Sequence, residues 1–132
     1  IAERVGDERG MDNQGRKTYT LWDVYPHADL VTYPSTYEGF GNAFVEAVYF
    51  RRPIVVNEYA IFEADIKPKG FDVVAISGFL TEENVERTRR VITDPAYAAE
   101  MAETNYMLGW RYLSHEVLEE KLEQLLVNYY GA

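Results

Sequence analysis

The order of apolar and polar positions along the chain predicts short strands that alternate with helices. Three runs of mostly apolar, β-prone residues are typical of buried strands, because apolar side chains fill consecutive positions rather than every second one. These runs span residues 30–33, 53–57 and 71–76. Apolar residues at helical spacing predict short helices at about 20–28 and 42–50, and three longer helices in the C-terminal half.

The three C-terminal helices have recognisable first residues. Thr81, Asp94 and Ser114 each precede a helical pattern and belong to residue types that cap helix N-termini. Pro follows Asp94 at the first helical position, where it is favoured. We expect the last helix to turn one apolar stripe toward the core, formed by Leu118, Leu122, Leu125 and Tyr129. Residues 1–19 hold three glycines among charged residues and are predicted to be irregular.

This alternation predicts an α/β fold, a Rossmann-like parallel sheet with helices on both faces. Only three strands are predicted, whereas an open doubly wound sheet normally has about five or six. The chain also begins with Ile1 rather than with Met. We therefore expect residues 1–132 to form one partial domain whose first strands precede Ile1.

Composition narrows the function. The chain has 132 residues, the size of one domain, and its lack of cysteine excludes disulfides and thiolate metal sites. We expect neither a metal nor a bound cofactor. The net charge of -9 argues against nucleic acid, whose binding needs a basic surface, and means that an anionic ligand requires local positive potential. No apolar run approaches the ~20 residues of a transmembrane helix, so we expect a cytoplasmic protein.

The stretch that carries the chemistry is PSTYEGFGNAFVEA, residues 34–47. It runs from the end of a strand through a loop into a helix, and ligands of open α/β sheets bind at such places. The first N–H groups of the helix attract anionic oxygens, and Gly39 and Gly41 allow close approach to the backbone. Glu38 and Glu46 stand eight residues apart, and carboxylates accept hydrogen bonds from sugar hydroxyls. The stretch therefore predicts a site for a phosphate-linked sugar.

The same stretch resembles the E-x7-E motif of family 4 retaining glycosyltransferases of the GT-B fold, in which P-S-x-x-E-G-F-G is followed by E-A. Eight positions match, at residues 34–35, 38–41 and 46–47. The flanking helix and strands are similar too, so that the resemblance covers about residues 20–130. It implies that the chain is the C-terminal, nucleotide-sugar-binding part of such an enzyme, without its N-terminal acceptor domain.

The resemblance implies a role for each matched residue. Glu38, the candidate catalytic residue, contacts hydroxyls of the donor sugar, and Glu46 binds the ribose hydroxyls of the nucleotide. The sugar and phosphate are held by backbone amides of Gly39, Phe40, Gly41 and Asn42. The implied substrate is a nucleotide-diphosphate sugar, such as a UDP- or GDP-sugar, transferred with retention to an unknown acceptor without an essential metal. The fragment alone is expected to be inactive, and any peripheral membrane contact would come from the missing domain.

The sequence departs from the family pattern in three places. Arg51 and Arg52 stand where the family usually has Gly before the next strand, so that an Arg there must accept the cost of a left-handed backbone or the turn must differ. Residues 58–63 stand where the family often has a Gly-Gly pair and a Glu, and the basic pair that neutralises the diphosphate lies upstream of this chain. Two alternatives therefore stay open: a non-catalytic nucleotide-sugar-binding module, and a GT-B-type phosphorylase or epimerase.

Overall fold

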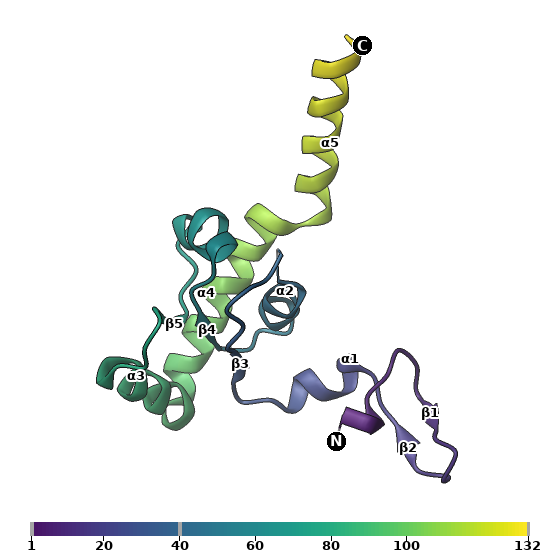
Figure 1. Ribbon diagram of the computed structural model, residues 1–132, viewed down its shortest axis with the longest axis vertical. Coiled ribbons are helices and arrows are strands. Elements are labelled where there is room, and N and C mark those ends of the chain that lie inside the picture. Colours follow the sequence, from purple (N-terminus) through teal and green to yellow (C-terminus); the bar gives the residue numbers. More distant parts are fainter. Residues whose placement is uncertain (1, 40, 132) are drawn as a thin grey trace.

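A three-stranded parallel sheet forms the centre of the computed structural model, which describes residues 2–39 and 41–131 (Figure 1). Its strands are β3 (Val31–Tyr33), β4 (Ile54–Asn57) and β5 (Val74–Ile76), in the order β3-β4-β5. The register pairs Val31 with Ile54 and Val55 with Val74. The predicted α/β class with a parallel sheet is thus confirmed, and all three predicted strands are present.

The third strand is shorter than predicted, because a side chain takes the place of a neighbouring strand at its start. The backbone N–H of Asp72 donates to Oδ1 of Asn105 at 2.7 Å, and Nδ2 of Asn105 donates to the carbonyl of Asp72 at 2.7 Å. Asn105 is fully buried, and both polar groups of its side chain are satisfied by this exchange. Phe71 and Val73 therefore pack into the core without joining the sheet.

The three C-terminal helices begin where their capping residues predict. They are α1 (Leu21–Val24) with a following 3-10 turn (Tyr25–His27), α2 (Asn42–Tyr49), α3 (Glu82–Thr93), α4 (Pro95–Leu113) and α5 (His115–Tyr130). The side chains of Thr81, Asp94 and Ser114 each accept a hydrogen bond from a backbone N–H in the first turn of α3, α4 and α5. Each cap thereby satisfies one of the donors that a helix start leaves without an intrahelical partner.

Both faces of the sheet are covered. Ile54 and Val56 of β4 face a core cluster that includes Phe44 and Ala47 of α2, whereas Val55 between them faces a second cluster with Met101 of α4. Side chains of a strand alternate between its two faces, so the three buried positions of β4, Ile54, Val55 and Val56, are all apolar. Helix α4 contacts both α2 and α3 and so joins the two layers (Figure 1).

Two segments that the sequence left without regular structure contain short elements. Residues 2–19 form a 3-10 turn (Ala2–Arg4) and an antiparallel hairpin of β1 (Gly10–Met11) and β2 (Lys17–Thr18), which lies apart from the main sheet (Figure 1). The Asp12 carboxylate organises the hairpin loop by accepting from the backbone N–H groups of Gln14 and Arg16. After β4, a π-helical turn (Phe62–Ile66) leads into a 3-10 turn (Lys67–Lys69).

The predicted packing of the last helix is wrong for this chain. Its apolar stripe, formed by Leu118, Leu122, Leu125 and Tyr129, is more than half exposed at every position. Figure 1 shows α5 extending away from the sheet, and no residue of α5 is buried. Helical spacing predicted the stripe correctly, but the stripe meets no core. Among the residues that the structure describes, no helix has the length and apolar character needed to cross a membrane.

Candidate functional site

The predicted site residues gather between the carboxyl end of β3 and the start of α2. Glu38 is partly buried in the connecting loop, next to the exposed Gly39. Gly41 is the residue that precedes the first turn of α2, and the exposed Asn42 begins the helix. Phe40, which was predicted to contribute a backbone amide, lies outside the described residues. The predicted strand–loop–helix context is therefore present.

Two tyrosines close one side of the helix start. Gly41 has a φ of 89°, and a Cβ placed on it would lie 2.5 Å from the hydroxyl oxygen of Tyr59 and 3.3 Å from the ring of Tyr33. Glycine is required here both by the left-handed backbone and by the space that the tyrosines occupy. The helix start is thus enclosed at Gly41 and exposed at Asn42.

Glu46 is held by Tyr25. The Tyr25 hydroxyl donates a hydrogen bond of 2.9 Å to Oε2 of Glu46 from the 3-10 turn that follows α1. The Tyr25 ring stacks on Phe50, with 4.8 Å between ring centroids and 4° between ring planes. Burial and the neighbouring Glu46 carboxylate raise the pKa of Tyr25, so that the phenol stays protonated and remains a donor.

Glu38 has a similar partner in Tyr33. Burial, together with a hydrogen bond to Glu38 and the charge of that carboxylate, raises the pKa of Tyr33 to about 12. Burial and the Glu38 charge also raise the pKa of Tyr59. The Tyr33 phenol contributes in turn, as the smallest cause, to the raised pKa of Tyr25. Each of the two predicted carboxylates therefore has a tyrosine as a partner.

Sequence reasoning missed these tyrosines. An ionised carboxylate has about four lone-pair positions, so each Glu retains acceptor capacity after one phenol has donated to it. The region thus presents acceptors for ligand hydroxyl groups, beside backbone N–H groups at the helix start that attract anionic oxygens. One signal was available: Tyr33 immediately precedes the motif at the end of a predicted strand. Nothing local in the sequence indicated that Tyr25 reaches Glu46, 21 residues further along the chain.

The next strand end carries a second polar group. Nδ2 of Asn57 donates to the carbonyl of Ser35 at 3.3 Å and so ties the end of β4 to the motif loop. Glu58 follows with its side chain 7% exposed, and Nζ of Lys67 lies 2.6 Å from its Oε1. The hydrogen bond from Lys67 holds the pKa of Glu58 below its usual range. Of these residues, Glu58 lies in the segment 58–63, where the sequence departs from the family pattern.

Arg51 adopts the left-handed conformation that the turn needs, with a φ of 50°. The N–H of Arg52 bonds the carbonyl of Ala47 at 2.8 Å, and the N–H of Arg51 bonds that of Val48 at 3.0 Å. This pair of bonds is a Schellman ending, which usually has glycine at the position of Arg51. The Arg51 side chain instead pairs with Glu103 at 2.8 Å. The turn is therefore retained, and Arg51 points to α4 rather than to the predicted site.

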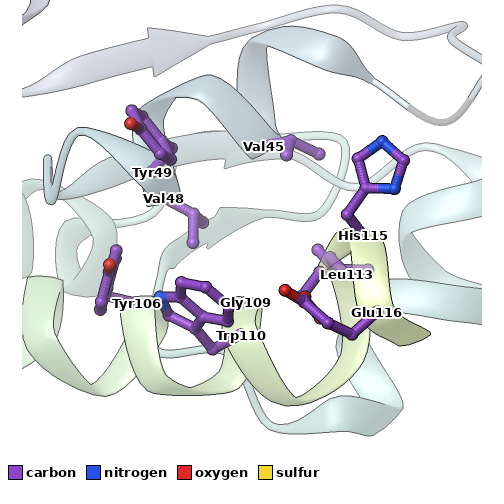
Figure 2. A pocket seen from close by; sticks show the side chains of 10 residues that line it. Val45, Val48, Tyr49, Tyr106, Gly109, Trp110, Leu113, His115 and Glu116 are labelled. Carbon is purple, nitrogen blue, oxygen red and sulfur yellow. The ribbon is translucent and has the colours of Figure 1, made fainter. Parts of the chain in front are cut away.

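An apolar groove of about 340 Å³ lies on a different face of α2. Figure 2 shows Val45, Val48 and Tyr49 of α2 on one side of it and Trp110 of α4 on the other. The two helices can approach closely because Gly109 has no side chain. A Cβ at this position would lie 2.6 Å from Cγ1 of Val48. None of the predicted site residues lines this groove. Among the described residues, no group of three or more His, Asp or Glu side chains is arranged to hold a metal ion.

Comparison with known proteins gives a consistent picture. Residues 10–107 match the family described as glycosyl transferases group 1. The chain is 36% identical over 122 residues to a mannosylglucosylglycerate synthase of Thermotoga maritima, which covers 83% of this chain and 29% of that protein. It is 44% identical over 76 residues to a mannosylglucosylglycerate synthase of Petrotoga mobilis, which covers 58% of this chain and 17% of that protein. The chain thus spans less than a third of the length of these relatives, and no solved structure matches it.

Proposed function

The chain belongs to the group 1 glycosyl transferases, and on this premise we propose that it is the C-terminal, donor-binding part of a retaining enzyme of family 4. In this proposal a nucleotide-diphosphate sugar lies across the start of α2. The observation that carries it is the pairing of Glu46 with Tyr25 beside the exposed first residue of that helix. Such a site combines acceptors for hydroxyl groups with donors for phosphate oxygens.

Each motif residue receives one role. Glu38 accepts hydrogen bonds from the donor sugar close to the reacting carbon, and Glu46 accepts them from the ribose. The backbone N–H groups of residues 39–42 bind the sugar and the diphosphate. These assignments are supported by the strand–loop–helix context and by the tyrosines that meet both carboxylates.

The relatives supply the proposed substrates. Both are named mannosylglucosylglycerate synthases, and we propose that this chain serves the transfer of a mannosyl group to glucosylglycerate. An acceptor hydroxyl oxygen forms the new bond to the anomeric carbon, while the bond from that carbon to the diphosphate breaks. The nucleoside diphosphate leaves with the bonding electrons, and the hydroxyl proton is released. Retention means that the new bond has the anomeric configuration of the old one.

A product assay tests this proposal. The full-length protein is incubated with glucosylglycerate and either GDP-mannose or UDP-glucose, and products are identified by mass spectrometry and by the anomeric coupling in NMR spectra. We expect a mannosylated product with retained configuration, and turnover reduced by at least about 100-fold in Glu38→Gln and Glu46→Gln. A sugar phosphate or an epimer as product, or nucleotide binding without any turnover, would contradict the proposed transfer.

A further inference from the structure

Tyr25 is arranged as a rigid support for Glu46. Its ring stacks on Phe50, and Trp22 packs edge-on against the same Phe50 with 5.1 Å between ring centroids. Pro26 follows in the 3-10 turn and fixes the backbone φ at the next position. The hydroxyl at the end of this ring lies 2.9 Å from Oε2 of Glu46. The donor is therefore held by aromatic packing rather than by a flexible chain.

Glu46 benefits from such a support because only its backbone is fixed by the core. Its neighbours Ala47 and Val48 are buried and anchor α2, whereas the Glu46 side chain is partly exposed. A glutamate side chain loses up to about 2 kcal/mol of conformational entropy when a ligand immobilises it. A hydrogen bond that already restricts the carboxylate removes part of this loss before the ligand arrives.

We propose that Tyr25 is a positioning residue that orients Glu46 toward the ribose and thereby makes the site selective for ribonucleotides over 2′-deoxyribonucleotides. The inference rests on the proposed function, since it requires that Glu46 meets the ribose. With Oε2 occupied by the phenol, Oε1 faces the ligand and accepts from the adjacent 2′- and 3′-hydroxyls of the ribose. A 2′-deoxyribose lacks one of the two adjacent hydroxyls, so the carboxylate loses a donor.

Tyr25 remains a hydrogen-bond donor to Glu46 at neutral pH. The phenol remains protonated because burial and Glu46 raise the pKa of Tyr25. A phenol can donate to a carboxylate but gives no positive charge, so it fixes Glu46 without neutralising it. A Lys or Arg in this place would compete with the ribose hydroxyls for the carboxylate. A tyrosine therefore suits a carboxylate that must remain a strong acceptor for a neutral ligand group.

Calorimetric titration of the full-length protein with GDP and 2′-deoxy-GDP tests the inference, with UDP and 2′-deoxy-UDP as a parallel pair. For the nucleotide that binds better, we expect the wild-type protein to prefer the ribose form by about tenfold or more, since tenfold is the lower end of the value of one hydrogen bond to a charged group. Tyr25→Phe keeps the stacked ring but lacks the hydroxyl. It should weaken binding of the ribose form by about tenfold and change the deoxyribose form far less, so that the preference nearly disappears.

A double-mutant cycle separates orientation from a general loss of structure. If Tyr25 acts through Glu46, Tyr25→Phe has no further effect once Glu46→Gln is present. Tyr49→Phe is the matched control, because it removes a phenol hydroxyl from the same aromatic cluster. Tyr49 lines the apolar groove rather than the proposed site. The Tyr49→Phe variant should therefore bind both nucleotides as the wild type does. Thermal unfolding of each variant checks that the fold is intact.

The outcomes distinguish the inference from the proposed function. If Glu46→Gln weakens binding and Tyr25→Phe does not, the role of Tyr25 is overturned and the donor site stands. Equal losses for ribose and deoxyribose forms in Tyr25→Phe also overturn the selective role. If Glu46→Gln binds both nucleotides as tightly as the wild type, the proposed donor site fails, and the inference fails with it.

Discussion

At the scale of single residues, the candidate site depends on positions that meet two structural requirements at once. Gly41 must take a positive φ and must also leave room for Tyr59. Tyr25 packs in an aromatic cluster and also donates to Glu46. Such positions tolerate little change, because a substitution that meets one demand violates the other.

Gly41→Ala tests this directly. The left-handed backbone costs an alanine about 1–2 kcal/mol, and the new Cβ would collide with the buried Tyr59. We expect the free energy of unfolding to fall by at least this amount in a urea titration. Gly39→Ala is the control for stability, since a Cβ there meets no atom within 4 Å, and it should change the free energy by less than about 0.5 kcal/mol. Similar stability of both variants would mean that the loop rearranges.

Lys67 should protect the fold against acid. Its ammonium group lowers the pKa of the nearly buried Glu58, so the pair contributes stability above the unfolded pKa of about 4.3, and this stability is lost as the pH falls through the lower folded value. Lys67→Met removes the partner, and we expect the midpoint of acid unfolding to move to higher pH. Arg89→Met, which removes one half of the exposed pair with Glu86, should leave the midpoint nearly unchanged.

At the scale of elements, the end of α2 shows how side-chain contacts replace glycine. Arg51 holds the left-handed position of the Schellman turn and places its guanidinium 3.5 Å from the ring centroid of Tyr106, beside Glu103. These contacts to α4 offset part of the backbone cost. The turn that leads into β4 is therefore fixed by its backbone hydrogen bonds to α2 and by the contacts of Arg51 with α4.

Two substitutions separate the backbone cost from the contacts. Arg51→Ala and Arg51→Gly both lose the pairing with Glu103 and Tyr106, but only glycine relieves the positive φ. We expect Arg51→Gly to be more stable than Arg51→Ala by about 1 kcal/mol in chemical unfolding. If alanine were the more stable of the two, the turn would have to leave the left-handed conformation when arginine is removed.

Local signals in the sequence predicted where helices and strands lie better than they predicted which distant residues contact one another. The capping residues Thr81, Asp94 and Ser114 act within one turn of chain, and all three predicted helix starts are confirmed. The start of β5 was not predictable in the same way, because it depends on Asn105, 33 residues away from Asp72. The motif loop was identified from its own residues, whereas Tyr25 and Tyr59 reach it only through the fold.

At the scale of the whole molecule, the net charge constrains how the proposed site attracts its ligand, and the last helix exposes an apolar stripe. A chain with net charge -9 repels a nucleotide diphosphate at long range, so the attraction must come from the local donors at the start of α2. Helix α5 leaves an apolar stripe exposed, while this chain spans less than a third of the length of its relatives. Helical spacing alone gave no means of knowing whether that stripe meets a core.

The exposed stripe yields a prediction for the 132-residue chain itself. Leu122 is 51% exposed and Met101 is 1% exposed, although both lie on apolar stripes of C-terminal helices. Met101→Ala removes buried side-chain volume and should lower the free energy of unfolding by about 2–5 kcal/mol. Leu122→Ala removes side-chain atoms that remain largely in water, and it should lower the free energy by less than about 0.5 kcal/mol. The two variants are compared by urea unfolding at low protein concentration, where α5 has no second chain to meet. A loss of 2 kcal/mol or more for Leu122→Ala would show that α5 packs against the rest of this chain in solution, and α5 would then not extend from the domain as it does in Figure 1.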